Sequence, residues 1–259
     1  MKDMELLNRK IMECDDIIMD TFISRLDGGK DMIKLQKENG LSVIHSDIDQ
    51  NRKEYRMEKI AASPYREELT ELFLTMERVM RKMQIKQLFS RNIMLIGFMG
   101  TGKSTVSAHL SKELGMEEVD MDALIVKNEG ISIASMFEQH GETYFRDKET
   151  HTLAEVQKRD QLIVSCGGGI VLRDENIELM KGNGRVVLLT ATPETIYDRV
   201  KNSKERPILN SNMSVEYITE LMEKRRERYM QSADVVISTD GKLIPQICEE
   251  IVSKVIEME

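Results

Sequence analysis

The chain has 259 residues, of which 41% are hydrophobic and 32% are charged, and its formal net charge is −8. This acidic balance argues against a nucleic-acid or anionic-membrane binder, because either would need a dominant basic surface. The sequence contains no apolar stretch long enough to span a membrane. Its N-terminus lacks the apolar core of a signal peptide, and its three cysteines lie too far apart to indicate a disulfide framework or a metal site. We therefore expect a cytoplasmic protein with one large domain or two modest ones.

Residues 1–90 contain no convincing strand and predict three helices of unequal length. Apolar residues recur at helical spacing over residues 6–26, which indicates one long first helix. Ser46-Asp47 is a suitable cap for a second helix. Ser63-Pro64 then offers a cap and a proline at the first helical position of a third helix, whose apolar stripe runs over residues 69–83.

From Asn92 the pattern changes to short apolar runs that alternate with helix-length segments. The apolar runs lie at residues 93–96, 162–164, 186–189 and 235–237, and the short segment 117–119 is expected to form a further, second strand. Each run is too short for a helix and lies next to a turn signal, which is typical of a parallel sheet with helices on both faces. We therefore predict an all-α three-helix domain at residues 1–90. An α/β domain with a parallel five-stranded sheet is expected to follow at residues 91–259.

The segment Gly97–Ser104 matches the pattern G-x-x-x-x-G-K-[ST] at every position, between an apolar run and a helix that ends at Gly115. Its glycines let backbone N–H groups turn inward around phosphates, and the helix N-terminus adds a positive field. Lys103 can bridge the β- and γ-phosphates, and the Ser104 hydroxyl can ligate Mg²⁺. A glycine-rich turn with a chance Lys-Ser pair is disfavoured, because both flanking elements are of the right type. The predicted nucleotide-binding residues of this segment are Gly100, Thr101, Gly102, Lys103, Ser104 and Thr105.

Two polar pairs follow. Asp120 and Asp122 come after the short segment 117–119, at the expected carboxyl end of a second strand, which is the edge where ligands bind in α/β proteins. One carboxylate can act near Mg²⁺ and the other on an acceptor hydroxyl, although Asp122 could equally cap the next helix. Arg146 offers a planar fork for a carboxylate, and Glu149, one turn further on, could hold that fork. An ordinary surface ion pair is the simpler alternative for these two residues.

The last polar features are a glycine run and a group of arginines. Gly167-Gly168-Gly169 comes directly after an apolar run and can place backbone N–H groups against a ligand, although a loose turn is possible. Arg199 and Arg206-Pro207-Ile208-Leu209 lie in a polar stretch, and Arg225 and Tyr229 follow. Phosphoryl transfer requires water exclusion and charge neutralisation, so an arginine-bearing lid fits the chemistry. Any single arginine here could also be a solvated charge.

These features, in this order over residues 92–259, resemble the shikimate kinases. That family carries the glycine loop, D-x-D, G-E-x-x-F-R with a downstream Glu, G-G-G, an R-P-L lid and an R-x-x-x-Y helix. Here the lid reads R-P-I-L, and the final helix lacks the proline often found in it. The resemblance implies a P-loop kinase domain with a lid, which uses ATP and Mg²⁺ to convert shikimate to shikimate 3-phosphate.

The resemblance also implies roles for the site residues. The expected catalytic residues are Lys103, Asp122 and Arg206. Asp122 would accept the hydroxyl proton, while Arg206 would close over the phosphates. Ser104 would ligate Mg²⁺, Asp120 would act through the metal's water shell, and Arg199 would pack near the adenine. The expected shikimate-binding residues are Asp122, Arg146, Gly167, Gly168, Gly169 and Arg225.

Residues 1–90 resemble the all-helical chorismate mutases, which also have one long helix, a shorter one and a third. The positions that fit are Arg25, Gln84 and, with a one-residue bulge at Gly28-Gly29, Lys37. The family's early arginine position falls instead on Asn8, and its Arg-Glu pair has no counterpart around Ile48-Asp49. Three hypotheses stay open: a working mutase, a decayed mutase kept for dimerisation or regulation, and a structural helical arm. The resemblance implies a homodimer through this domain.

The kinase domain has alternatives of its own. A gluconate or nucleoside-monophosphate kinase would share the glycine loop, but the spacing of D-x-D, Arg146 and the triple glycine disfavours both. A nucleotide-gated regulatory module would bind ATP without a committed acceptor. The expected partners are therefore ATP, shikimate and a second copy of the chain, with neither nucleic acid nor membrane.

Overall fold

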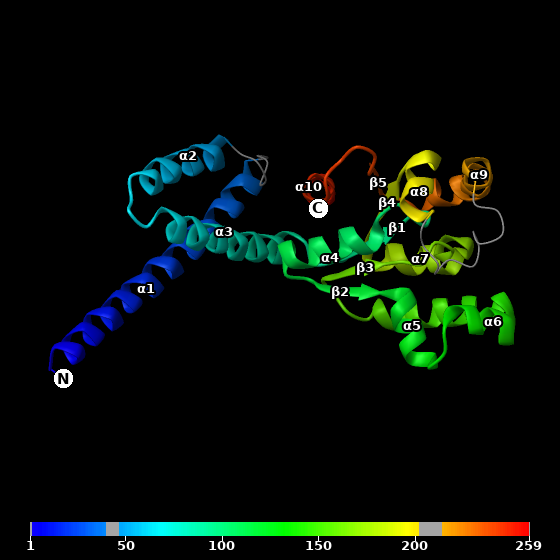
Figure 1. The fold of residues 1–259 in the computed structure, drawn as a ribbon, viewed down its shortest axis with the longest axis horizontal. Helices are drawn as coiled ribbons and strands as arrows, with labels where there is room; N and C mark the ends of the chain where they lie inside the picture. The colour runs from blue at the N-terminus through cyan, green and yellow to red at the C-terminus, as the bar shows by residue number, and fades with distance from the viewer. Residues whose placement is uncertain (1, 40–46, 202–213, 259) are drawn as a thin grey trace. The chain divides into compact units, whose positions relative to one another are not determined.

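The structure, a computed structural model, describes residues 2–39, 47–201 and 214–258 (Figure 1). The chain forms two compact units, Met1–Gln87 and Leu88–Glu259, each with its own contacts. In the described part of the chain, no helix is both long enough and apolar enough to cross a membrane.

The first unit consists of the three expected helices, α1 (Lys2–Glu38), α2 (Asp47–Ala61) and α3 (Arg66–Leu88). The expected cap at Ser46 lies outside the described residues. The prediction that Pro64 occupies the first helical position of α3 is wrong, because the helix begins at Arg66. Ser63 Oγ instead accepts a hydrogen bond from the Tyr65 N–H group at 3.1 Å, which closes a turn around the proline.

Only the C-terminal part of α1 is packed within this unit. Gly29, Ile33 and Gln36 are buried there, whereas residues 3–21 are exposed. A Cβ atom on Gly29 would overlap the Met80 thioether, so the close approach of α3 explains a buried glycine in mid-helix. The described helix runs through both glycines without a break, so it lacks the one-residue bulge that would bring Lys37 into register with the mutase lysine.

The second unit is built on a five-stranded parallel sheet, in the order β2-β3-β1-β4-β5. The strands are β1 (Asn92–Ile96), β2 (Glu117–Asp120), β3 (Leu162–Ser165), β4 (Gly184–Thr190) and β5 (Val235–Ser238). The helices are α4 (Lys103–Leu114), α5 (Met121–Glu129), α6 (Ile133–Val156), the 3₁₀ turn η1 (Ile170–Leu172), α7 (Asp174–Gly182), α8 (Pro193–Val200), α9 (Val215–Ser232) and α10 (Ile244–Ile256). The five-stranded parallel sheet and its flanking helices confirm the predicted fold class.

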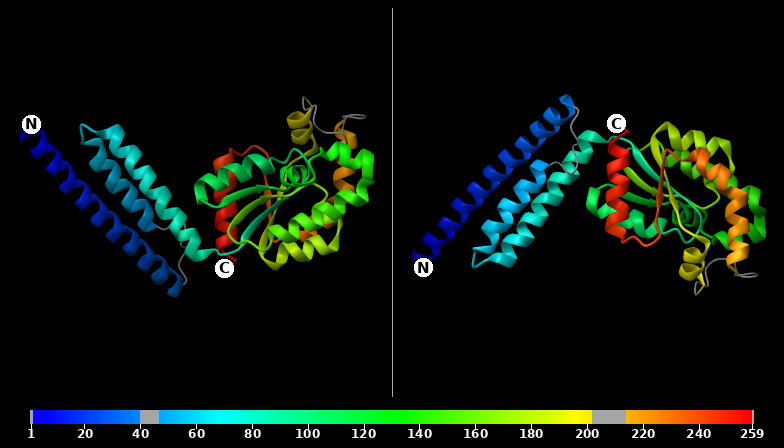
Figure 2. Two further views of the ribbon diagram at one scale, coloured as in Figure 1. Left: turned by 90° about the horizontal axis from the view of Figure 1, so that it is seen from below. Right: turned by 90° about the horizontal axis from the view of Figure 1, so that it is seen from above.

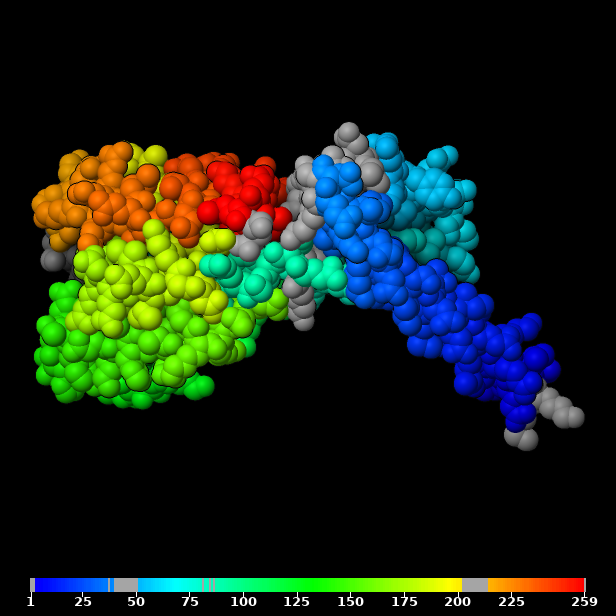
Figure 3. Space-filling view, turned by 180° about the vertical axis from the view of Figure 1, so that it is seen from behind, coloured from blue at the N-terminus to red at the C-terminus, as the bar shows by residue number. Residues whose placement is uncertain are grey.

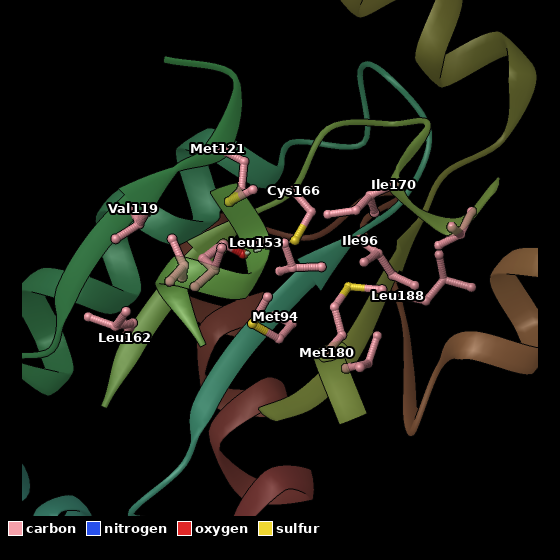
Figure 4. Close-up of a cluster of buried hydrophobic side chains, with 14 of the residues drawn as sticks. Met94, Ile96, Val119, Met121, Leu153, Leu162, Cys166, Ile170, Met180 and Leu188 are labelled. Carbon is pink, nitrogen blue, oxygen red and sulfur yellow. Dashed lines mark hydrogen bonds between the residues drawn. The ribbon is translucent and has the colours of Figure 1, made fainter. Parts of the chain in front are cut away.

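Helices cover both faces of this sheet (Figure 2). On one face, α4 and α10 contact each other and the strands, and on the other, α7 and α9 contact β4. All five residues of β1 are therefore buried, which explains its unbroken apolar run. Figure 4 shows part of the resulting core, in which Met94 and Ile96 of β1 lie among side chains of neighbouring strands and helices.

The strand order also locates a ligand site. Because β1 lies between β3 and β4, the segments that follow β1 and β3 leave the sheet at its carboxyl edge side by side. A crevice at such a switch in strand order is where open α/β sheets bind ligands. The glycine loop follows β1 and the triple glycine follows β3, so both motifs meet at this edge.

Candidate active site

The glycine loop between β1 and α4 has the backbone conformation that its sequence predicts. Gly97, Gly100 and Gly102 have φ values of 143°, 80° and 95°, in the region that favours glycine. A Cβ atom on Gly100 would also lie 2.8 Å from Val200 Cγ1. Gly102 is the N-cap of α4 and makes no side-chain cap hydrogen bond. The helix terminus therefore lacks the capping oxygen that usually satisfies its first N–H groups, and an anion such as phosphate is the ligand it favours.

Lys103, the first residue of α4, lies over this loop. Its Nζ donates to Gly97 O at 2.8 Å and to Phe98 O at 3.1 Å, so the ammonium group is positioned at the phosphate-binding loop. Thr101 is buried and its hydroxyl donates to Phe98 O at 2.8 Å, which holds the turn of the loop. Thr105 is exposed on the first turn of α4.

The residues predicted to act at a metal lie together beside α4. Ser104 Oγ donates to Asp120 Oδ2 at 3.3 Å and lies 3.5 Å from Ser165 Oγ. Asp120 Oδ1 accepts from the Ala123 N–H group at 3.0 Å, so the cap of α5 is Asp120 and not Asp122. Among the described residues, no three His, Cys, Asp or Glu side chains form a metal cluster. One hydroxyl and one carboxylate fit Mg²⁺, which takes oxygen ligands and usually keeps several waters.

Arg146 and Glu149 form a buried ion pair rather than the surface pair that the spacing alone favoured. Gly141, with φ 80° and ψ 173°, breaks α6, and the helix resumes toward the sheet edge. Arg146 Nη1 donates to Glu149 Oε2 at 2.8 Å, and the two side chains are 11% and 1% exposed. Arg146 Nε and Nη2 also donate to Glu142 Oε1, at 3.2 and 3.1 Å. The second oxygen of Glu149, Oε1, is buried and has no hydrogen-bond partner among the described residues.

Burial changes the acid–base properties of this pair. Desolvation raises the pKa of Glu149, against the attraction of Arg146, and the nearby charge of Asp122 raises it further. Burial alone would lower the pKa of Arg146, but attraction and hydrogen bonding from Glu149 and Glu142 outweigh it and raise the pKa. Arg146 therefore stays charged, with a guanidinium group held in one orientation.

The triple glycine after β3 lies among these groups. A Cβ atom on Gly167 would lie 2.8 Å from Asp122 Oδ1 and 3.0 Å from Glu149 Oε1. A Cβ atom on Gly169 would overlap the guanidinium group of Arg146. A side chain at either position would displace charged groups, which explains why glycines occupy them. The acidic groups and the guanidinium group therefore converge on this loop.

The same loop lies against the phosphate-binding loop. A Cβ atom on Gly168 would be 3.7 Å from Gly97 O and 3.9 Å from Met99 N. From α9, Arg225 Nη1 donates to Gly168 O at 3.1 Å and Tyr229 Oη donates to the same oxygen at 2.5 Å. Burial raises the pKa of Tyr229 to about 12, so its hydroxyl stays a donor.

Arg199 on α8, which was expected near the adenine, lies beside the phosphate-binding loop. Its Nη1 donates to Gly100 O at 3.2 Å and to Thr239 Oγ1 at 2.9 Å, and its Nη2 donates to Thr239 O at 3.1 Å. The guanidinium group thus connects the phosphate-binding loop to the end of β5. Arg206 and the expected lid lie outside the described residues.

Sequence reasoning missed three contributors to this region. Thr239, directly after β5, belongs to no sequence motif, and only its hydrogen bond with Arg199 reveals its place in this region. Arg228 on α9 binds the segment after the triple glycine. Glu142 was part of the G-E-x-x-F-R pattern, but its bond to Arg146 was not anticipated. An acidic residue one turn before an arginine was the available signal for Glu142.

Of the three side chains predicted for a mutase site in the first unit, the structure describes only that of Arg25. Arg25 Nη1 is buried and has no hydrogen-bond partner within the described part of the chain. Burial lowers the pKa of Arg25, and the positive charge of Arg52 lowers it further. The side chains of Lys37 and Gln84 lie outside the described residues. Sequence reasoning did not single out Arg52, whose charge acts on Arg25.

A parallel sheet whose first strand leads through a glycine loop into a helix, next to converging carboxylate and guanidinium groups, defines a P-loop phosphotransferase. The profile of the family "Shikimate kinase" matches residues 99–256. The chain therefore belongs to the shikimate kinase family, and its second unit is a kinase domain.

Individual relatives agree with this assignment. A shikimate kinase of Dehalococcoides mccartyi is 42% identical over 160 residues, which are 62% of this chain and 90% of that protein. A shikimate kinase of Persephonella marina is 45% identical over 165 residues, which are 64% of this chain and 99% of that protein. Among solved structures, shikimate kinase from Acinetobacter baumannii in complex with shikimate has a TM-score of 0.62 and 32% identity, over 65% of this chain and 94% of that one.

Proposed function

We propose that the second unit transfers the γ-phosphoryl group of ATP to shikimate, giving shikimate 3-phosphate and ADP. The observation that carries this proposal is the convergence of Asp122, Arg146 and Glu149 on the triple glycine, directly beside the phosphate-binding loop. A hydroxylated carboxylic acid needs a cation for its carboxylate and an acidic group near its reacting hydroxyl, and this arrangement supplies both.

On the nucleotide side, the N–H groups of the glycine loop and the start of α4 hold the phosphates, and Lys103 neutralises charge that develops during transfer. Ser104, with Asp120 acting through water, would hold Mg²⁺, which shields the phosphate oxygens from the incoming hydroxyl. Arg199 lies at the adenine, with its guanidinium edges fixed by Gly100 and Thr239. For Arg206, which lies outside the described residues, the family resemblance implies a role in closing over the phosphates.

On the acceptor side, Arg146 binds the carboxylate of shikimate through its planar fork, oriented by the buried Glu149. Arg225 adds a second cation from α9, and the N–H groups of Gly167–Gly169 bind substrate oxygens. Asp122 accepts the proton of the attacking hydroxyl, because its carboxylate reaches the loop that holds the acceptor. The two loops touch at Gly168, so the reacting oxygen and the γ-phosphate are brought together.

ADP release measured with and without shikimate tests this function. We expect release that requires shikimate and is abolished in Lys103→Met, and shikimate phosphorylation that survived this substitution would refute the assignment. Gluconate and nucleoside monophosphates serve as comparison acceptors, and a preference for either would identify a different kinase. ATP turnover that ignored shikimate would favour a nucleotide-gated regulatory module instead.

For the first unit we propose a chorismate mutase-like domain at residues 1–90, with the kinase domain at residues 91–259. Arg25 and Arg52 support a site for a dianion there, because a buried guanidinium nitrogen without a partner and a second nearby positive charge favour a negatively charged ligand. Chorismate carries two carboxylates. Gln84 is a further proposed member of this site, whereas Lys37 fits the family's lysine position only with a bulge that α1 does not have.

Loss of chorismate without ATP, measured on the intact chain, tests mutase activity. We expect Arg25→Met and Arg52→Met each to abolish it, while Lys53→Met on the same helix leaves it unchanged. Binding of chorismate without turnover would indicate a decayed mutase used for regulation. The absence of both binding and turnover would leave a structural or dimerising arm.

We also propose that the chain forms a homodimer through this unit, in a cytoplasmic setting that suits its three free thiols. The exposed residues Met4, Leu7, Ile11 and Ile18 recur at helical spacing and continue the face of α1 that is buried further on. Figure 3 shows this N-terminal part of α1, in dark blue, extending beyond α2 and α3. A second copy that covers the stripe would remove it from water.

Sedimentation equilibrium at micromolar concentration tests the dimer. Ile11→Glu is expected to shift the chain toward monomer, while Asp20→Asn, an exposed position on the opposite face of the same helix, leaves the mass unchanged. A monomeric wild-type chain would refute the proposal.

A further inference from the structure

Helix α9 holds the segment that follows β3 through three side chains. Arg225 Nη1 and Tyr229 Oη both donate to Gly168 O, as described above. Arg228 Nε donates to Val171 O at 3.1 Å and its Nη2 donates to Leu172 O at 2.9 Å. The third nitrogen of Arg228, Nη1, donates to Asp174 Oδ1 at 2.7 Å. All three nitrogens of this guanidinium group are therefore bound to the short stretch from Val171 to Asp174, the first residue of α7.

Arg226, two residues earlier on the same helix, shows what an ordinary surface arginine does. Its side chain is 71% exposed and pairs with Glu223, one turn back on α9. The Arg228 side chain is 33% exposed and binds backbone carbonyls of another segment. Carbonyl acceptors in two directions and a carboxylate in a third fix the planar guanidinium group, so it cannot slide along the segment.

The segment held by Arg228 is continuous with the acceptor loop. The Ile170 N–H group donates to Gly167 O at 3.1 Å, and the Leu172 N–H group donates to Gly169 O at 3.0 Å. These two turns join the triple glycine to the 3₁₀ turn η1, so a shift of the carbonyls at 171–172 shifts the glycines as well. Gly169 lies against the Arg146 guanidinium group, and Gly167 lies against Asp122 and Glu149.

The hydrogen bonds from α9 also orient the peptide group between Gly168 and Gly169. In a trans peptide the carbonyl and the following N–H group point in opposite directions. Because the Gly168 carbonyl is drawn toward α9, the Gly169 N–H group points away from α9. The helix therefore fixes the orientation of the glycine peptides as well as their position.

We propose that Arg228 is a positioning residue for the acceptor site. It binds the stretch Val171–Asp174 to α9 and so sets the spacing between the triple glycine and the Arg146 guanidinium group. This inference rests on the proposed function and adds a residue that contacts neither substrate. It concerns the acceptor side, so the affinity for ATP should not depend on Arg228.

Steady-state kinetics on the full chain test this role, with shikimate varied at saturating ATP and ATP varied at saturating shikimate. We expect Arg228→Met to raise the KM for shikimate about tenfold or more, because a small misplacement of binding groups is costly. The KM for ATP and the kcat should change less than about threefold. Arg228→Lys should be intermediate, because one ammonium group cannot reach all three acceptors. Arg226→Met is the matched control and should leave every parameter unchanged.

Thermal unfolding of the same variants separates positioning from a merely structural role. A lower melting temperature with both KM values unchanged, or raised equally, would overturn the inference. If Arg228→Met does not fold, Arg228→Lys and Asp174→Asn decide the question. In these variants a KM raised for shikimate alone supports the inference, and an unchanged KM for shikimate refutes it. A wild-type chain that failed to phosphorylate shikimate would refute the proposed function itself, which the first measurement reveals.

Discussion

Replacing Arg146 with methionine should destabilise the kinase unit strongly, because the partner of this arginine is a buried carboxylate. The Glu149 side chain is 1% exposed, and one of its oxygens already has no hydrogen-bond partner among the described residues. Opposite charges about 4 Å apart attract by about 4 kcal/mol at an effective dielectric constant of about 20. Removing one member of a buried pair costs about 3–5 kcal/mol, since the other charge is left uncompensated. At about 2–4 °C per kcal/mol for a unit of this size, Tm should fall by roughly 6–20 °C.

The double variant Arg146→Met/Glu149→Leu distinguishes this explanation from a simple loss of packing. With both charges removed, stability should return to within about 1–2 kcal/mol of wild type. Shikimate phosphorylation should stay lost in both variants, because the carboxylate fork is absent. The control is Arg226→Met, which removes the exposed ion pair of Arg226 with Glu223 and should lower the free energy of unfolding by less than about 1 kcal/mol. Urea denaturation followed by circular dichroism gives the free energies of unfolding.

Two results would refute this reasoning. Arg146→Met and Arg226→Met could lose the same small amount of stability, which would mean that the buried pair is energetically equivalent to an exposed one. Alternatively, the double variant could be less stable than Arg146→Met, which would mean that Glu149 stabilises the fold without its arginine.

Three further predictions follow from the same contacts. Because desolvation raises the pKa of Glu149, the folded state holds the proton of this carboxyl more tightly than the unfolded state does. The free energy of unfolding of wild type relative to Glu149→Gln should therefore fall as pH rises through that raised pKa. Urea denaturation midpoints measured against pH check this, and a difference that grows with pH would contradict it. Thr239→Val removes an acceptor of Arg199 and should raise the KM for ATP about three- to tenfold without changing the KM for shikimate, as initial rates will show. Asn92→Leu leaves Gln157 and the Leu162 N–H group without their buried partner, so unfolding should become easier by about 1–3 kcal/mol with both KM values unchanged.

The parts of the fold that could be predicted are those encoded by contiguous residues. The glycine loop needs eight neighbouring positions, and its flanking strand and helix are adjacent to it. The apolar runs of β1, β3 and β4 are unbroken because helices cover both faces of the sheet there, so each of these runs is visible without knowledge of its neighbours. The αL glycine at position 115 likewise marks the end of α4 through local backbone geometry alone.

The parts that could not be predicted depend on contacts between distant segments. The spacing of Arg146 and Glu149 is the same for an exposed pair and a buried one, and only the packing of α6 decides between them. Two carboxylates two residues apart both suit a helix cap, and the end of β2 selects Asp120. Thr239 and Arg228 are separated from their partners by 40 and 57 residues, and no periodicity reports such pairs.

The two units differ in how well the described residues satisfy their own buried charged groups and apolar side chains. In the kinase unit Arg146 is matched by Glu149 and Glu142, so the acceptor site is organised before substrate arrives. In the helical unit a buried nitrogen of Arg25 has no hydrogen-bond partner within the described residues, and half of α1 exposes an apolar stripe. Each of these features is costly in isolation, and the proposed partners would relieve both: an anion for the guanidinium group, and a second copy of the chain for the stripe. A chorismate-dependent rise in the Tm of the helical unit that is lost in Arg25→Met would support an anion bound at this guanidinium group.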